Sequence, residues 1–285
     1  MVRRAMRFTP EVLLSAPRRS AGVPNPSGTK VLYTTSSYDF KSHNKTSELR
    51  LLDVNSGDSH ELAKNDEISD LNWLDDETFA CLQAEKDGST SIYVANISKM
   101  PDSKASHYVA GKIDTGASNL KVVPLDDDGK AFAVMVSAPS LPDGSMHTIN
   151  DTSKKTYSSG HLYTSNFVRH WDAYETKPKS SLWFGTLSKA KEEKYELSKL
   201  QNALKGSRLE CPIPPFGGGD NFDIGPQGAI LVAKDPNLDP ALNTKCNVYL
   251  LQIKSWTQPE TPHLEELAIE GFEGAASSPV VGSAR

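Results

Sequence analysis

Four short runs along the chain share one pattern of hydrophobic positions. Each is six residues long, is apolar at its first, third and sixth positions, and is followed by polar or turn-forming residues. Short runs of this kind, rich in aliphatic, β-branched and aromatic residues, predict β-strands. The four runs are LRLLDV at 49–54, IYVANI at 92–97, LWFGTL at 182–187 and VYLLQI at 248–253.

A second unit precedes each run: a polar turn that leads into another apolar segment. Asp, Asn, Pro and Gly supply the backbone dihedrals of such turns. A pair of strand motifs that repeats at 40–50-residue intervals predicts the four-stranded blades of a β-propeller. The alternative, an all-β sandwich, explains short strands but not their repetition as a pair. The turns at Gly28, Asp76, Gly129 and Gly228 lie 48, 53 and 99 residues apart.

The third unit contains an insertion. From the turn residue to the strand motif is 16 to 21 residues in the first, second and fourth units, but 53 residues in the third. The excess predicts about 32 inserted residues between the second and third strands of that blade. The stretch SNFVRHWDAYETK, residues 165–177, lies inside this insertion.

These intervals predict an all-β fold: a partial β-propeller of about four four-stranded blades plus the start of a fifth. Residues 1–22 form an N-terminal segment with a short helix, which Thr9 caps and Pro10 begins. The incomplete propeller occupies residues 23–285. Its predicted blades are residues 23–65, 68–113, 118–213 and 220–270, with the next blade starting at 275–285.

Four chemically versatile side chains are neighbours in the insertion: Arg169, His170, Trp171 and Asp172. In an extended chain His170 and Asp172 point to one face and the other two to the opposite face. A His–Asp pair can orient a general base, but no nucleophile accompanies it. We therefore favour a docked loop, with Trp171 as an apolar anchor and Arg169 in a salt bridge.

The common catalytic and ligand-binding motifs are absent from the sequence. It contains no G-x-S-x-G, no P-loop, no HExxH and no Cys/His cluster, so we predict no catalytic residue, no metal and no cofactor in this chain. The glycine-rich stretch at 214–228 lacks the G-x-G-x-x-G spacing and is interpreted as the crossover into the fourth blade. The charged stretch at 188–206 is interpreted as surface.

Composition narrows the partners. The chain is 37% hydrophobic and 24% charged, as in soluble globular proteins, and its net charge of −5 gives no reason to expect nucleic acid or an anionic membrane. No apolar run approaches the ~18 residues that span a bilayer. The N-terminus lacks the apolar core of a signal peptide, which favours the cytoplasm. Three glycosylation sequons, at Asn44, Asn96 and Asn150, favour secretion instead.

The three cysteines are too widely spaced for a metal or redox motif. We expect Cys81, Cys211 and Cys246 to be buried thiols, with one Cys211–Cys246 disulfide as the alternative.

Several longer stretches resemble the N-terminal half of fungal dipeptidyl peptidase V, a secreted serine peptidase of the prolyl oligopeptidase family. They include FTPEVLLSAPRRSAGVPNPSG near the start, SSYDFKSHNKTSELRLLDVNSG, ISDLNWLDDETF, FVRHWDAY, PPFGGGDNFDIGPQG, and GFEGAASSPV near the end. They span almost the whole chain in the expected order. The resemblance implies secretion and a propeller that gates and positions substrate for a hydrolase domain with a Ser-Asp-His triad.

The resemblance also implies what this chain lacks. The C-terminal α/β-hydrolase domain is absent, so peptide substrates would be bound and cleaved only through that missing domain. The residues assigned to substrate positioning are Arg169, His170, Trp171, Asp172, Tyr174 and Glu175, with Tyr163 as an aromatic neighbour. The alternative is a truncated, non-catalytic propeller that serves as a binding module or has no function.

Overall fold

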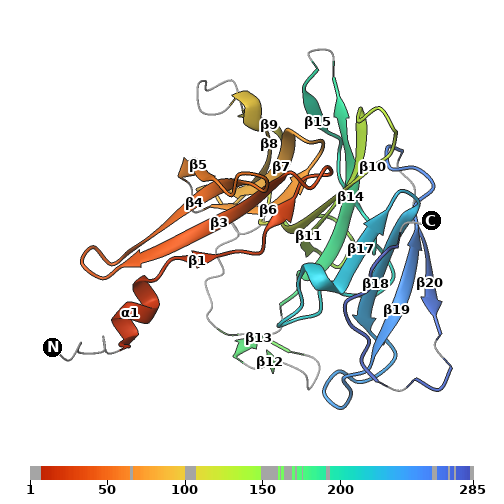
Figure 1. Cartoon of the computed structure of the whole chain (residues 1–285). Helices are drawn as coiled ribbons and strands as arrows, with labels where there is room; N and C mark the ends of the chain where they lie inside the picture. The colour runs from red at the N-terminus through yellow and green to blue at the C-terminus, as the bar shows by residue number, and fades with distance from the viewer. Residues whose placement is uncertain are drawn as a thin grey trace. The chain divides into compact units, whose positions relative to one another are not determined.

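The structure, a computed structural model, is almost entirely β (Figure 1). It describes residues 8–64, 67–99, 107–148, 160, 162–163, 169–170, 172–174, 176–190, 193–258, 262–268, 270–272 and 274–282. Within these residues the one α-helix is α1 (Pro10–Ser15), as predicted. Thr9 caps it, because its hydroxyl accepts a hydrogen bond of 3.3 Å from the Val12 N–H.

The remaining elements form four antiparallel sheets, each built from consecutive strands of the chain. The first consists of β1 (Arg18–Arg19), β2 (Val23–Pro24), β3 (Lys30–Asp39), β4 (Asn44–Asp53) and β5 (Ser59–Lys64). The second consists of β6 (Ile68–Trp73), β7 (Thr78–Ala84), β8 (Thr90–Asn96) and β9 (His107–Ile113), with a 3-10 turn at Ile97–Lys99.

The third sheet has the order β10 (Ser118–Pro124), β11 (Ala131–Ser140), β14 (Lys179–Lys189) and β15 (Tyr195–Leu197), and β16 (Gln201–Asn202) also pairs with β14. The fourth has the order β17 (Phe222–Gly225), β18 (Gly228–Lys234), β19 (Cys246–Gln252) and β20 (His263–Leu267). A 3-10 turn at Gly219–Asn221 leads into β17. A separate hairpin consists of β12 (Arg169–His170) and β13 (Ala173–Tyr174).

The repeated motifs occupy equivalent places in the four sheets. The six-residue runs fall in β4, β8, β14 and β19, each the third strand of its sheet, and the turn units lead into the second strands β3, β7, β11 and β18. The predicted partial propeller of four blades is therefore confirmed. The start of a fifth blade stays a prediction, since the described residues there contribute one isolated bridge, Ala275 with Cys246.

The turn between β17 and β18 requires glycine at position 228. Gly228 has φ +147°, a conformation that side chains rarely adopt. A Cβ there would overlap the Leu251 carbonyl oxygen of β19. The Gly-Pro-Gln-Gly sequence that predicted a strand boundary thus also permits the close approach of β18 to its neighbour.

The chain forms two compact units, Met1–Cys81 with Val94–Tyr108, and Leu82–Tyr93 with Val109–Arg285. In the first unit, the Trp73 indole N–H donates to the Val23 carbonyl at 2.8 Å and its ring meets the edge of Phe79. Buried Asn25 uses both ends of its amide, accepting from the Lys30 N–H and donating to the Asp76 carbonyl. These contacts join the first sheet to the β6–β7 hairpin.

The core of the second unit comes from its third and fourth sheets. The largest fully buried side chains include Met135, Leu182, Phe184, Phe222, Leu231 and Leu251. Strand β10 lies against β17. There Lys121 pairs with Asp223 at 3.1 Å, and its ammonium lies 5.5 Å from the centre of the Phe222 ring. This pairing links two successive blades across their seam.

The interpretation of residues 188–206 as surface was wrong in part. Tyr195 of β15, Ala203 and Leu204 are buried. The Tyr195 hydroxyl donates to the Gly129 carbonyl at 2.7 Å, and its ring packs edge-on against Phe132. The charged residues around Tyr195 made this segment look like surface in the sequence, but it contains β15, the fourth strand in the order of the sheet.

The three cysteines are free and buried, as expected, and the alternative of a Cys211–Cys246 disulfide is contradicted. Each sulfur of that pair has its own backbone acceptor, the Asn221 carbonyl for Cys211 and the Thr244 carbonyl for Cys246. Burial raises the pKa of the Cys81 thiol to about 12 and also raises the pKa values of Cys211 and Cys246.

We expect the folded chain to react slowly with a thiol reagent at pH 8. The reactive species is the thiolate, and a raised pKa keeps all three thiols protonated at that pH. In denaturant without reductant, three thiols per chain should react at once. A count of one would mean that a disulfide forms after all.

Candidate functional site

The insertion predicted in the third blade is present between β11 and β14. These strands pair without interruption from Ala131 opposite Ser188 to Ser140 opposite Lys179. Residues 141–178 are therefore an excursion from the end of one continuous ladder. Its first part is a tight turn, in which the Leu141 N–H donates to the Ser145 carbonyl and the Gly144 N–H to the Leu141 carbonyl.

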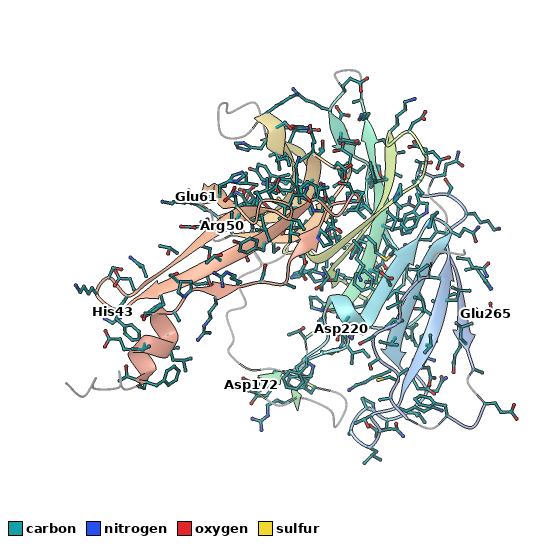
Figure 2. All side chains as sticks on the ribbon, viewed as in Figure 1. His43, Arg50, Glu61, Asp172, Asp220 and Glu265 are labelled. Carbon is teal, nitrogen blue, oxygen red and sulfur yellow. The ribbon has the colours of Figure 1, made fainter. Side chains whose placement is uncertain are left out.

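Residues 169–170 and 173–174 pair as a hairpin and do not form the extended segment we expected. Arg169 pairs with Tyr174 and His170 with Ala173, and Asp172 lies in the turn between β12 and β13. We expected His170 and Asp172 to point to the same face of one extended strand. Instead, His170 lies in β12 and Asp172 lies in the turn that follows. Asp172 is exposed at the turn (Figure 2).

The described side chains of the hairpin are exposed to solvent. Arg169 is exposed, and its expected salt bridge stays a prediction. Tyr174 is 60% exposed, and its ring stacks on that of Tyr163 with centroids 6.2 Å apart and an interplanar angle of 25°. Trp171, Glu175 and the side chain of His170 lie outside the described residues, so their assigned roles stay predictions.

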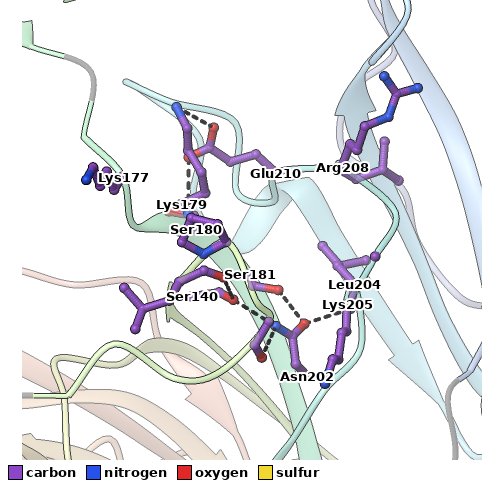
Figure 3. A pocket seen from close by; sticks show the side chains of 15 residues that line it. Ser140, Lys177, Lys179, Ser180, Ser181, Asn202, Leu204, Lys205, Arg208 and Glu210 are labelled. Atoms are coloured by element: carbon purple, nitrogen blue, oxygen red, sulfur yellow. Dashed lines mark hydrogen bonds and ion pairs between the residues drawn. The ribbon is translucent and has the colours of Figure 1, made fainter. Parts of the chain in front are cut away.

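A pocket of about 370 Å³ lies where the insertion leaves and rejoins the blade (Figure 3). Its walls come from the end of β11, the start of β14, and the segment that follows β16. We call it the root pocket. Sequence reasoning did not find it, because three segments far apart in the chain converge there and none of them has a recognisable motif.

Asn202 organises the polar floor of the root pocket. Its Nδ2 donates to the Ser140 hydroxyl at 2.9 Å and to the Gly144 carbonyl at 3.0 Å. Its Oδ1 accepts from the Ser181 hydroxyl at 2.7 Å and from the Leu204 N–H. The network ties the insertion's first turn to the third strand, which holds the floor in one arrangement.

The rim of the root pocket is basic. Four cations, Lys177, Lys179, Lys205 and Arg208, line it together with one carboxylate, Glu210. Glu210 Oε1 accepts from the Ser180 N–H at 3.1 Å, and its Oε2 lies 3.8 Å from the Lys179 ammonium.

The turn beside the root pocket contains one further acid, Asp143. Its pKa is lowered, first by the hydrogen bond from the Ser145 hydroxyl, then by the Ser145 N–H, and also by the charge of Lys205.

Two further findings bear on the predicted chemistry. Among the described residues, no group of three His, Cys, Asp or Glu side chains is placed to hold a metal ion. No described helix has the length and apolar character needed to cross a membrane.

The sequons differ in accessibility. Asn44 is exposed at the start of β4. The Asn96 side chain is half-buried and engaged at both ends: its amide nitrogen donates to the Thr78 hydroxyl at 3.2 Å, and its oxygen accepts from the Ser98 N–H. Asn150 lies outside the described residues.

If the chain is passed through a secretory pathway, we expect a glycan on Asn44 and none on Asn96. Asn44→Gln should then remove one glycan-sized step on a gel, whereas Asn96→Gln should leave the mobility unchanged. Deglycosylation of each variant provides the reference, and a mobility change in Asn96→Gln alone would contradict the accessibility argument.

Comparison with known proteins identifies relatives over nearly the full sequence. The chain is 33% identical over 284 residues to the probable dipeptidyl-peptidase 5 of Emericella nidulans and 32% identical over 297 aligned residues to the dipeptidyl-peptidase 5 of Aspergillus oryzae. Each alignment covers 97% of this chain but only 38% and 39% of the relative. The chain thus spans about two fifths of the length of these relatives. No protein-family model matches it.

Solved structures support the fold. An acylaminoacyl peptidase in complex with Z-Gly-Gly-Phe-chloromethyl ketone superposes with a TM-score of 0.53, covering 91% of this chain and 33% of that one at 11% identity. An acylaminoacyl peptidase of Pyrococcus horikoshii gives 0.51, covering 92% and 34% at 10% identity. At such identities the likeness is one of fold.

Proposed function

We propose that this chain, a relative in sequence of the fungal dipeptidyl-peptidase 5 proteins, is the propeller part of a serine peptidase that releases dipeptides from peptide N-termini. The observation that supports this most is the alignment of 97% of the chain with proteins of that name. The four successive blades support it as well, because they match the propeller that such a peptidase would place over its active site. On this proposal the protein is secreted and glycosylated.

The role of such a propeller follows from the chemistry of the nucleophile. A Ser-Asp-His triad attacks any peptide bond that reaches it, so selectivity must come from restricted access. A second domain over the site admits short extended peptides and excludes folded protein. Loops of the propeller that reach the site then hold the part of the substrate that does not react, which aligns the scissile bond.

The hairpin in the insertion is the part of this chain we assign to substrate positioning. A peptide's free N-terminus is a cation, and a cation in a partly desolvated site requires a carboxylate or several acceptors. Asp172 presents an exposed carboxylate at the hairpin turn, and the stacked Tyr163 and Tyr174 rings offer an aromatic surface on the same insertion. Glu175 is the second carboxylate of the stretch. Arg169, His170 and Trp171, which precede Asp172, complete the set of residues that we assign to substrate positioning.

A chimera tests the proposal. Residues 23–282 of this chain would replace the aligned segment of the Aspergillus oryzae dipeptidyl-peptidase 5. We expect the chimera to cleave a dipeptidyl chromogenic substrate and to reject its N-acetylated analogue, because acetylation removes the charge that the site is proposed to hold. A folded chimera without activity, or one that cleaves both substrates equally well, would refute the proposal.

A further inference from the structure

The root pocket has more positive charge than its own carboxylate neutralises. Four cations and one carboxylate line the rim, and Asp143 beside it adds a second negative charge, which leaves a formal excess of two positive charges. Glu210 is already engaged by the Ser180 N–H and by Lys179. Lys177 and Lys205 make no hydrogen bond or ion pair with any described residue. A concave site with uncompensated cations favours an anionic ligand.

Local structure keeps two of these lysines at the rim. Lys177 lies in the bend just before β14 and Lys179 begins that strand, and both side chains line the pocket. The stem of Lys205 lies on the backbone of Gly144, where a Cβ would come within 2.5 Å of the lysine Cγ. Gly144 has φ +83° and so accommodates both the turn and the lysine.

Neutral donors complete the site. The Ser180 hydroxyl makes no hydrogen bond to a described residue and faces the pocket beside Lys179 (Figure 3). The guanidinium of Arg208 donates one N–H to Asn237 Oδ1 at 2.9 Å, which leaves further N–H groups for a ligand. Lysine, arginine and hydroxyl groups around one pocket are the donor set of a carboxylate site.

We propose that the root pocket binds a carboxylate of the peptide substrate, supplied by an acidic residue or by the peptide's C-terminus. The proposal rests on the proposed function, since that is what makes the ligand a peptide. The volume of about 370 Å³ suits one or two residues and not a polymer. The net charge of −5 disfavours long-range attraction of a polyanion, so the preference is local to the pocket. The enzyme would thereby favour acidic peptides.

The test measures binding of matched peptides to the 285-residue chain by isothermal titration. Ala-Ala-Ala-Asp-Asp with a free C-terminus is compared with Ala-Ala-Ala-Asn-Asn amide. We expect the acidic peptide to bind roughly tenfold more tightly at low salt, because exposed charge pairs contribute about 0.2–1 kcal/mol each and several act together. The difference should shrink in 0.5 M NaCl, since salt screens exposed charges.

Charge removal at the rim provides the decisive variant. Lys177→Gln with Lys205→Gln should weaken the acidic peptide roughly three- to tenfold and leave the amide peptide unchanged. Lys45→Gln with Lys86→Gln, two exposed lysines elsewhere in the chain, makes the same charge change and should have no effect. Should the double variant fail to fold, Lys177→Glu alone tests the same point, since that side chain is exposed and has no described partner.

Equal binding of the two peptides, or equal losses in rim and control variants, would overturn the proposal. The proposal would also be overturned if inorganic phosphate bound and the acidic peptide did not, because the pocket would then be an anion site that does not recognise peptides. An active chimera without this preference would leave the proposed function standing and refute only the carboxylate site. An inactive chimera that keeps the preference for the acidic peptide would refute the proposed function and leave the carboxylate site standing.

Discussion

Replacing Phe184 by alanine should lower the free energy of unfolding of the second unit by about 3–5 kcal/mol. Phe184 lies in β14, is fully buried, and meets the ring of Trp256 edge-on at 5.8 Å. It stands opposite Met135 of β11, which is also fully buried. Truncation removes a large apolar surface and leaves a cavity that the rigid sheets on either side cannot close. Urea unfolding, followed by tryptophan fluorescence, measures the loss.

The control is the same substitution at an exposed phenylalanine. Phe8 is 75% exposed, so Phe8→Ala should change the stability by less than about 0.5 kcal/mol. Similar losses at the two positions would show that Phe184 does not lie in a packed core, and would undermine the assignment of β14 as the third strand of its blade.

The repeated strands were predictable because their signal is local. The side chains of LWFGTL at 182–187 must be apolar where β14 faces neighbouring sheets, and the turn before β11 needs Asp and Gly for its dihedrals. Both requirements concern residues that are adjacent in the sequence, so they can be recognised without knowledge of the fold. The insertion was predictable from the same signal. The LWFGTL motif marks β14 as the strand that pairs with β11, although residues 141–178 separate the two strands along the chain.

Other features were not predictable because distant residues decide them. Tyr195 lies among lysines and glutamates, yet its hydroxyl finds an acceptor in Gly129 and its ring a neighbour in Phe132, more than sixty residues away. The root pocket likewise depends on Asn202 reaching Ser140 and Gly144. Neither partner is visible from the sequence around the residue itself.

The hairpin shows a third kind of failure. Residues 169–174 contain none of the Asn-Gly or Asp-Gly signals that mark a two-residue turn, so extended chain was the natural prediction. The pairing of Arg169 with Tyr174 is what places Asp172 at the turn. The identity of the candidate residues could be predicted, but their mutual geometry could not.

The second large effect concerns catalysis by the 285-residue chain alone. We expect it to hydrolyse a dipeptidyl chromogenic substrate no faster than buffer alone does. That rate is at least about 10⁶-fold below the rate of a typical enzyme. Hydrolysis of a peptide needs a nucleophile, a base within hydrogen-bond reach of it, and an oxyanion site. The chain contains no G-x-S-x-G, and β12 holds His170 in a hairpin with no serine or cysteine among its paired residues. His170→Ala should therefore leave the background unchanged, whereas turnover that survives repurification and is lost in this variant would make the stretch catalytic.

In the chimera the same hairpin should act on binding and not on the chemical step. Asp172→Asn keeps the shape of the side chain but removes the charge proposed to hold the substrate's amine. We expect KM to rise roughly fivefold with kcat within about twofold, because an interaction made equally in the ground and transition states affects KM alone. Asp58→Asn, an exposed aspartate in the turn between β4 and β5, is the matched control and should change neither constant. A fall in kcat at constant KM would instead mean that Asp172 acts in the transition state, and a response equal to that of Asp58→Asn would remove the hairpin from the substrate site.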